Sequence, residues 1–275
     1  MYPRMRGLSV WAFLAVIFAL AVQNSPAAAQ GALTREAVQE RLSKNTGSEI
    51  PDLSGLDLRR LDLSGLDFRQ ANLMKARLDS ANLSGAKLFA VNLTDASAIG
   101  ADLSKANLDG STLRRTNLQH ANLRGASLFA TIVEAADLSE ADLRDTRIIG
   151  YLKSAKLRGA NLQNANIGAD PGNQSMGVMR AQFGSADLSG ADFTGANLFK
   201  ADFSYAKLIG AKLVNADLRN AEMIQADLTE ADVTGANVAA ADLNGTIFTK
   251  AKGVPTLKGL DQARNKDKAV FDERN

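Results

Sequence analysis

The sequence predicts an all-β solenoid, in which short turns of a five-residue repeat stack on one another. Read in fives from Pro51, twenty repeats run unbroken to Gly150, and the third residue is Leu or Phe in seventeen of them. A second run over residues 181–250 has fourteen repeats, and thirteen begin with Ala. Aromatic residues make up only 5% of the chain, which suits an array that places Leu and Ala inside every turn.

The N-terminal segment has the pattern of an export signal. Two arginines precede the apolar run Leu8–Val22, and the small residues Ala27–Ala29 follow it. The apolar run is short for a spanning helix, which needs about 20 residues. We therefore expect a signal peptide at residues 1–29, with an uncleaved anchor as the alternative, and export to a bacterial periplasm or out of the cell.

Residue content and charge exclude several classes of site. Cysteine is absent, so neither disulfides nor a thiolate metal site can form. His120 is the only histidine, which excludes histidine clusters, and we expect no Ser–His catalysis because a solvated surface residue is its better interpretation. Without the two arginines of the signal, 30 of the 32 basic residues remain against 30 acidic ones. The basic excess typical of a nucleic-acid binder is missing, and we expect no cofactor, metal or nucleic acid.

Each repeat has the pattern of a very short strand followed by a corner. In the repeat ANLSG, Ala and Leu are two residues apart with a polar residue between them, which is one step of strand alternation. The Ser-Gly pair that follows suits a bend. Aspartates recur at the second position, where Asn replaces them freely. Because Asn would abolish an acid or base, we interpret these carboxylates as structural rather than catalytic.

The pattern A(D/N)LxG resembles that of the pentapeptide-repeat family, and the resemblance covers about 200 of the 275 residues. It implies a right-handed quadrilateral parallel β-helix with short helical caps, in which four repeats form one turn. The leading Ala and the central Leu or Phe then point inward. On this geometry Phe183 and Phe203 stack on one inner face, and Phe193 lies on the opposite face.

The repeat array occupies residues 51–250 and is flanked by two expected caps. Residues 30–50 form the N-terminal cap, in which Leu33–Ser43 is a helical plug with Thr34 as N-cap and an apolar side that covers the first turn. The pattern stops after Lys250, and residues 251–275 are expected to close the other end. There a short helix over Leu260–Asn265 precedes Ala269, Val270 and Phe271, which fold back over the last turn. Similar tails dimerise in some family members, so the resemblance also allows a homodimer through this end.

Two places on the array are candidate interaction surfaces. Phe89, Phe129 and Ile149 occupy the outward fourth position, and their separations of two turns and one turn place them on one side. Aligned exposed apolar residues can mark an interface, although scattered surface hydrophobes are common. The insertion at residues 170–180 interrupts the repeats and contains Met176 and Met179. These are either adaptable contact residues or part of a tolerated loop that folds onto the solenoid.

These observations favour a non-catalytic exported protein, a rigid solenoid scaffold that binds a protein or cell-envelope partner. One alternative is a DNA mimic that protects a topoisomerase, as in some members of the family. The export signal and the neutral charge balance oppose it. The other is a polysaccharide-active β-helix enzyme, which needs clustered acids or bases. The interruption of the repeats offers only Asp170 and Arg180 for that purpose, so we do not expect an enzyme.

Overall fold

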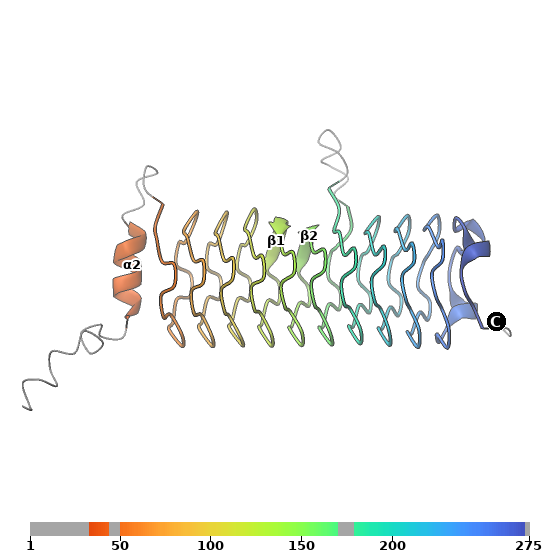
Figure 1. Cartoon of the computed structure of the whole chain (residues 1–275), viewed down its shortest axis with the longest axis horizontal. Coiled ribbons are helices and arrows are strands. Elements are labelled where there is room, and N and C mark those ends of the chain that lie inside the picture. The colour runs from red at the N-terminus through yellow and green to blue at the C-terminus, as the bar shows by residue number, and fades with distance from the viewer. Residues whose placement is uncertain (1–32, 44–49, 170–178, 273–275) are drawn as a thin grey trace, which may run out of the picture. The chain divides into compact units, whose positions relative to one another are not determined.

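The computed structural model describes residues 33–43, 50–169 and 179–272 (Figure 1). The chain divides into two units at Thr34 and Arg35, and the second unit contains helix α2 (Arg35–Ser43) and the solenoid. The predicted signal at residues 1–29 lies outside the described residues, so both its existence and the export that it implies remain predictions.

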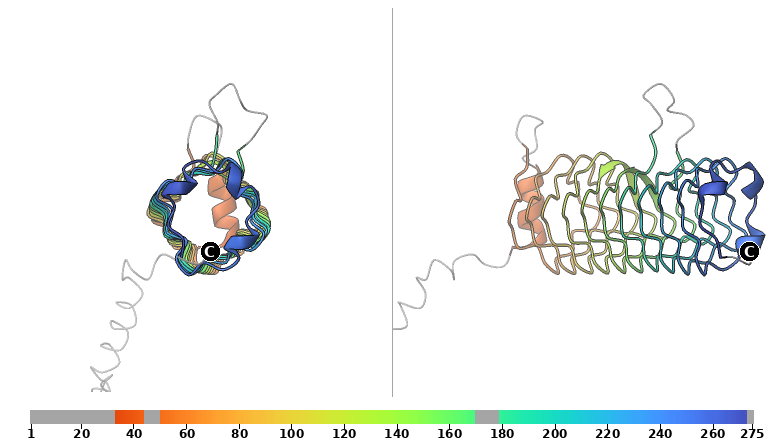
Figure 2. Two further views of the ribbon diagram at one scale, coloured as in Figure 1. Left: turned by 90° about the vertical axis from the view of Figure 1, so that its right-hand side faces the viewer. Right: turned by 45° about the vertical axis from the view of Figure 1, so that its right-hand side comes forward.

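The solenoid is held together by parallel bridges between second residues of repeats one coil apart. Asp52 pairs with Asn72, Asp57 with Arg77, and so on along the array. Bridges recur in every repeat and join each repeat to the fourth one after it, so each coil has four short bridged segments. The Leu53 N–H donates to the Asn72 carbonyl oxygen at 2.8 Å. Figure 2 shows the coils superimposed when they are viewed end on.

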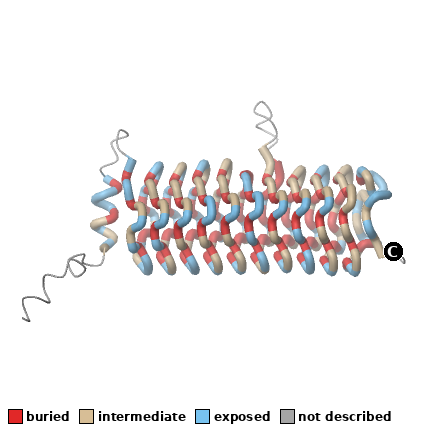
Figure 3. Tube along the Cα trace, in the orientation of Figure 1, coloured by how far each residue is buried: buried red, intermediate tan, exposed pale blue. Residues whose placement is uncertain are grey.

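The core is formed by the first and third residues of the repeats, which are buried along the array except at Leu56 and Leu61 in the first coil, which are half-buried (Figure 3). Phe183 and Phe203 stack with ring centroids 5.1 Å apart and an interplanar angle of 3°. Phe193 meets both rings edge-on, at 6.5 and 6.1 Å. The prediction that the first two rings stack and the third faces them is therefore confirmed. Offset and edge-on aromatic pairs add to the stability that burial gives.

The corners are four-residue turns in which the first residue of one repeat donates to the third residue of the repeat before it. The Leu56 N–H, for example, donates to the Leu53 carbonyl oxygen at 3.3 Å. The fifth residue of the repeat adopts a left-handed conformation, with φ of 65° at Gly210 and 59° at Lys200. Only glycine adopts this conformation without a steric cost, which explains why Ser-Gly and Thr-Gly recur at these corners.

Helix α2 (Arg35–Ser43) covers the N-terminal end of the solenoid (Figure 1). Val38 and Leu42 are buried. The Arg35 guanidinium donates from Nη1 to the Asp62 carbonyl oxygen at 2.7 Å and from Nη2 to that of Ser64 at 2.8 Å. The predicted cap helix is present, and it begins directly after Thr34, the residue expected as its N-cap.

The C-terminal end is closed by one further coil, which the sequence pattern did not reveal. Bridges continue from Asp232 with Lys252 to Ile247 with Val270, and each successive pair lies one position further apart in the sequence. The segments between bridges in this terminal coil have six residues instead of five. The corners are the 3-10 helices η2 (Val254–Thr256), η3 (Leu260–Gln262) and η4 (Lys266–Lys268).

The five-residue repeats do stop at Lys250, but the bridged ladder continues into the expected cap, because a six-residue unit keeps the bridges without continuing the five-residue pattern. Of the short helix expected over Leu260–Asn265, only Leu260–Gln262 is helical, as the 3-10 helix η3, and Asn265 already begins the next corner. The predicted return of Phe271 over the last turn is confirmed, since its ring stacks on Phe248 at 5.0 Å and 5°.

A candidate binding surface on one side of the solenoid

The bridged segments line up along the solenoid as four sides. Side 1 begins with residues 51–55, side 2 with 56–60, side 3 with 61–65 and side 4 with 66–70. The fourth and fifth residues of the side 4 repeats form the corner that leads to side 1 of the next coil, called here the side 4 corner. A side consists of segments that are bridged to one another, so the names also apply where a coil is shorter or longer than usual.

Three successive coils depart from the regular repeat, and all three do so at the side 4 corner. Strand β1 (Ser127–Ile132) runs through the corner with a bulge in its pairing. Strand β2 (Arg147–Tyr151) is one residue shorter, so bridges across this coil join residues one position closer in sequence, such as Asp142 and Asn161. The next coil carries the insertion, so Tyr151 pairs with the distant Gln182. Figure 1 shows β1, β2 and the described ends of the insertion following one another along one edge.

The short corner depends on a glycine. A Cβ added at Gly150 would lie 2.3 Å from the Thr131 carbonyl oxygen and 2.9 Å from its hydroxyl oxygen. Thr131 is itself buried and donates to the Leu128 carbonyl oxygen at 3.0 Å. The two strands therefore approach each other closely at this point, as only glycine permits.

The three residues predicted to form an exposed strip differ in exposure. Phe89 is 46% exposed. Phe129 is half-buried, and the Arg147 guanidinium lies over its ring at 4.4 Å from the centroid, a cation–π contact. Ile149 is only 2% exposed, so its predicted exposure was wrong. The reason is local: the shortened corner has no turn here, and Ile149 lies within β2, paired with Phe129.

A further aromatic residue belongs to the same corner. Phe199 is the fourth residue of a side 4 repeat, two coils beyond Ile149, because Arg147 bridges to Asn166 and Asn166 to Asn197. The Lys200 Nζ lies 5.3 Å and the Arg219 guanidinium carbon 5.8 Å from the centroid of its ring. A constant coil length of 20 residues does not predict Phe199 at this corner, because one shortened coil and one lengthened coil precede it. Phe89, Phe129 and Phe199 together are called the aromatic row.

At the insertion, the structure tests the predicted residues only in part. Met179 is half-buried, whereas Met176 lies outside the described residues. Arg180, which ends the insertion, donates two hydrogen bonds to the Glu222 carboxylate at 2.6 and 2.9 Å. The hydrogen bond to Glu222 raises the pKa of Arg180. A shallow cavity of about 390 Å³ lies beside this pair; its lining residues are Arg180, Lys200, Asn220, Glu222, Ala240 and Arg264.

Side 4 is also distinguished by charge. Within the five-residue repeats, side 2 has seven basic and seven acidic residues, and sides 1 and 3 each have four basic against six acidic. On side 4 five basic residues face three acidic ones. The basic residues are Arg69, Lys87, Arg147, Lys200 and Arg219, and the acidic ones are Asp67, Asp109 and Asp217. Among the described five-residue repeats, side 4 is thus the one side with a net positive charge.

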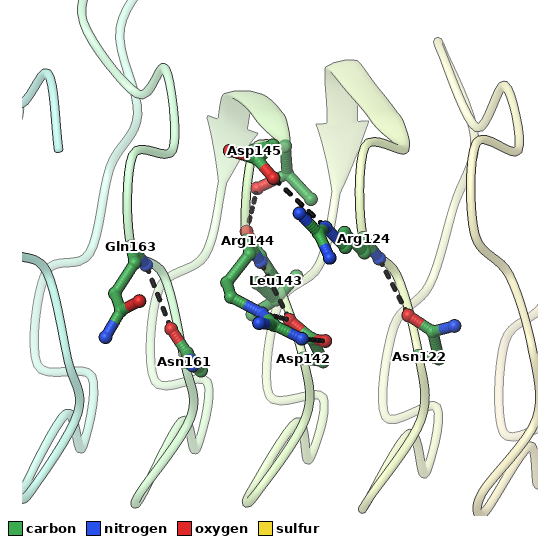
Figure 4. Close-up of polar contacts among 9 residues, drawn as sticks. Asn122, Arg124, Asp142, Leu143, Arg144, Asp145, Asn161 and Gln163 are labelled. Atoms are coloured by element: carbon green, nitrogen blue, oxygen red, sulfur yellow. Dashed lines mark hydrogen bonds and ion pairs between the residues drawn. The ribbon is translucent and has the colours of Figure 1, made fainter.

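The aspartates at second positions serve the backbone, as the exchange with Asn predicted. Asp142 accepts a hydrogen bond from the Arg144 N–H at 3.1 Å (Figure 4). Asn122 and Asn161 accept the equivalent bond from the residues two positions later, also at 3.1 Å. The Arg144 side chain also donates to Asp142, and this hydrogen bond lowers the pKa of the carboxyl group. His120, as expected, lies exposed at a corner.

Two kinds of feature are missing from the part of the chain that the structure describes. No group of three or more His, Asp or Glu side chains is placed to hold a metal ion there. Within the same ranges, no helix combines the length and the apolar character needed to cross a bilayer.

Comparison with solved structures finds other pentapeptide repeat proteins. The chain is 28% identical to the pentapeptide repeat protein HetL of the cyanobacterium Nostoc sp. strain PCC 7120, involved in heterocyst differentiation regulation. This match covers 82% of the chain and 90% of HetL, with a TM-score of 0.41. It is 26% identical to Rfr23 of the cyanobacterium Cyanothece 51142, covering 44% and 64% of the two chains, with a TM-score of 0.27.

A trypsin-treated form of QnrB1, a plasmid-mediated fluoroquinolone resistance protein, is 16% identical over 82% of this chain and 92% of its own, with a TM-score of 0.28. Comparison with curated proteins finds no match. The family model "Pentapeptide repeats" matches residues 52–88, 92–128, 179–213 and 211–249, which together make up more than half of the chain. The chain therefore belongs to the pentapeptide-repeat family.

Proposed function

We propose that this protein is a non-catalytic, exported scaffold that binds a protein or cell-envelope partner through side 4. One observation carries the proposal: the insertion, the aromatic row and the net positive charge all fall on the same side of the solenoid. Insertions in repeat proteins gather on one face, which is often the binding face. The proposal includes the right-handed quadrilateral form of the β-helix and removal of residues 1–29 as a signal.

The construction of the solenoid supports a scaffold role. Every coil is bonded to its neighbours through backbone groups, and the core is apolar except for a few hydroxyls that are hydrogen-bonded. Ser111, for example, donates to the Leu88 carbonyl oxygen at 2.5 Å. Such a surface is ordered before a partner arrives, so binding loses little conformational entropy.

The use of the carboxylates supports the absence of catalysis. At second positions they accept hydrogen bonds from backbone N–H groups two residues later, and several also pair with an adjacent arginine. Lowered pKa values at these groups, such as that of Asp217 beside Arg219, follow from those hydrogen bonds. A general acid would require a pKa raised toward neutrality.

Site-specific crosslinking in the native cell tests the function. A photoreactive amino acid replaces Phe89 or Phe199 on side 4, and the matched controls replace Ile99 or Ile209 at the side 2 corners, which are 37% and 38% exposed. We expect specific adducts from the two side 4 positions and none from the controls. Equal adducts from both sides, or none from side 4, would contradict the proposal. Recovery of a DNA topoisomerase would instead support the DNA-mimic alternative.

Two further parts of the proposal have simple measurements. Cell fractionation should recover a protein that starts after Ala29 outside the cytoplasm, and full-length protein in the cytoplasm would contradict export.

A homodimer through the C-terminal coil stays a prediction. Light scattering on purified protein gives the mass directly. Val270 is 48% exposed in that coil and is the residue to substitute when this interface is tested.

A further inference from the structure

The aromatic row runs along the solenoid axis. Side 4 residues of successive coils are joined by bridges, which fixes their spacing at about 4.8 Å per coil. Phe89 and Phe129 are two coils apart, and Phe199 lies three coils further on. The row therefore extends over about 24 Å. A ligand that touches all three rings must be extended and must lie parallel to the axis.

The charge of side 4 indicates the sign of that ligand. Lys87 shares a repeat with Phe89, Lys200 follows Phe199, and Arg147 lies over the Phe129 ring. A basic group thus lies near each aromatic ring, with one acidic residue, Asp109, at the corner between Phe89 and Phe129, whereas the other three sides are neutral or acidic. Because a side with a net positive charge raises the local concentration of anions, it favours an acidic ligand.

The remaining second positions of side 4 are rich in amides. Four of the nine repeats on this side carry asparagine there, namely Asn107, Asn166, Asn197 and Asn237. The Asn197 amide donates to the Asn166 side-chain oxygen at 3.0 Å, so these two amides are ordered by one another. The side-chain oxygens of Asn107, Asn197 and Asn237 each accept a backbone N–H, so these amides offer a ligand chiefly their N–H groups, which donate to hydroxyl or carboxylate oxygens.

We propose that side 4 binds an acidic linear polysaccharide that lies along the solenoid axis. The proposal rests on the proposed scaffold function and names its ligand class. The apolar face of a sugar ring stacks on an aromatic ring, its hydroxyls bond to the amides, and its carboxylates pair with the basic groups. One coil is close to the length of one sugar residue in an extended glycan. A folded acidic protein fits less well, since protein interfaces have a contiguous apolar centre.

Affinity electrophoresis of the purified protein tests this directly. Polygalacturonate in the gel should retard the protein, whereas fully methyl-esterified polygalacturonate, with the same backbone and no charge, should not. Replacing Lys87 and Lys200 together by Gln should weaken retardation about fivefold, since each exposed charge contributes modestly. Phe89→Ala should weaken it by a similar factor. Lys156→Gln with Lys207→Gln removes the same two charges from side 2 and should leave retardation unchanged.

Several results would overturn the proposal. These are no retardation by polygalacturonate, an equal loss in the side 2 control, or tighter binding of poly-glutamate or single-stranded DNA of equal charge. Far-ultraviolet circular dichroism shows whether each variant keeps its fold. If side 4 crosslinks a protein in the cell while polygalacturonate does not bind, the scaffold function stands and the glycan proposal fails. If side 4 gives no crosslinks in the cell while polygalacturonate still binds, the affinity for the glycan stands and the proposed scaffold function fails.

Discussion

The two ends of the solenoid are closed in different ways. At the N-terminal end a separate element, helix α2, lies over the first coil and buries Val38 and Leu42. At the C-terminal end the ladder closes itself with a coil of six-residue segments and 3-10 corners. An uncovered β-helix end exposes backbone groups that can pair with another chain. The N-terminal edge is thus covered by a helix. The C-terminal edge is reshaped by the six-residue segments and carries charged residues.

The stability of the two caps therefore depends on different kinds of residue. The N-terminal cap depends on a few side chains of one helix. The terminal coil is bonded to the coil before it at four bridges, beginning with Asp232 to Lys252 and ending with Ile247 to Val270. Its weak points are the positions where the six-residue segment needs a particular backbone conformation. Single substitutions can therefore separate the two kinds of closure.

The largest effect is expected from Val38→Asp in helix α2. Val38 is fully buried, and an unpaired carboxylate there should lower the free energy of unfolding by about 4 kcal/mol. Urea denaturation measures the loss, and light scattering reports aggregation through the uncovered edge. Gln39→Asp, on the exposed side of the same helix, is the control and should change stability by less than about 0.5 kcal/mol. Equal stability of the two variants would show that the helix does not close this end.

A pair of glycine substitutions compares the backbones of the two ends. Gly253 precedes η2 with φ of 77°, and an added Cβ would lie 2.5 and 2.6 Å from backbone atoms of Thr234. Gly253→Ala should cost about 3 kcal/mol of unfolding free energy, from strain and from the clash. Gly55 in the first coil has φ of 66° and no atom within 4 Å of an added Cβ, so Gly55→Ala should cost only about 1 kcal/mol. Equal losses in thermal unfolding would mean that the terminal coil is not closely packed on its neighbour.

Phe271→Ala weakens the C-terminal closure without changing its backbone. The ring is half-buried and stacks on Phe248, so its removal should cost about 2 kcal/mol. Phe271→Leu retains most of the apolar contact and should lose less than half of that amount. Calorimetry with the two variants gives the comparison. A loss as large as that of Val38→Asp would contradict the view that the ladder itself closes this end.

The smallest expected effect is acid sensitivity of the first coil. A hydrogen bond from Arg59 lowers the pKa of Asp57 from 3.8 to about 2, and that of Asp62 is lowered chiefly by its bond with Ser64. A depressed folded-state pKa stabilises the fold above the unfolded value, and this contribution disappears as pH falls through the folded value. Unfolding midpoints should therefore be level from pH 7 to about 5 and fall between about 4 and 2.

Solvent screens these exposed groups, so the decline assigned to any one of them is small. Asp57→Asn removes one contribution and should make the decline shallower. Stability that rises as the solution becomes more acidic would contradict the assigned direction.

The fold could be predicted from the sequence wherever the five-residue period holds. The stacking of Phe183 on Phe203, with Phe193 facing them, follows from their spacing once the family resemblance supplies four repeats per turn, because each residue's phase then sets its side and its direction. The terminal coil could not be found in this way. Its six-residue segments place Lys252, Lys258 and later bridge residues at spacings that no five-residue frame matches, although the backbone bonds are of the same kind.

The candidate surface could be predicted only in part, for a related reason. Phe89 and Phe129 were assigned to one side correctly, since the coils between them are of regular length. Phe199 was missed because a short coil and a long coil precede it, and only the bridges show where it lies. Ile149 was assigned to the right corner but with the wrong exposure. No pattern in the sequence shows that the corner loses its turn when one residue is missing.

The variable coil length at the side 4 corner has a practical consequence. Shortened, regular and lengthened coils all keep Tyr151, Gln182 and their neighbours in register, so length at this corner is decoupled from the ladder on both flanks. The corner therefore offers a grafting point, at which a foreign epitope or enzyme loop can replace the insertion while the core stays intact. Repeating such a graft at chosen coils would display several segments in a line, with intervals set by the number of coils between them.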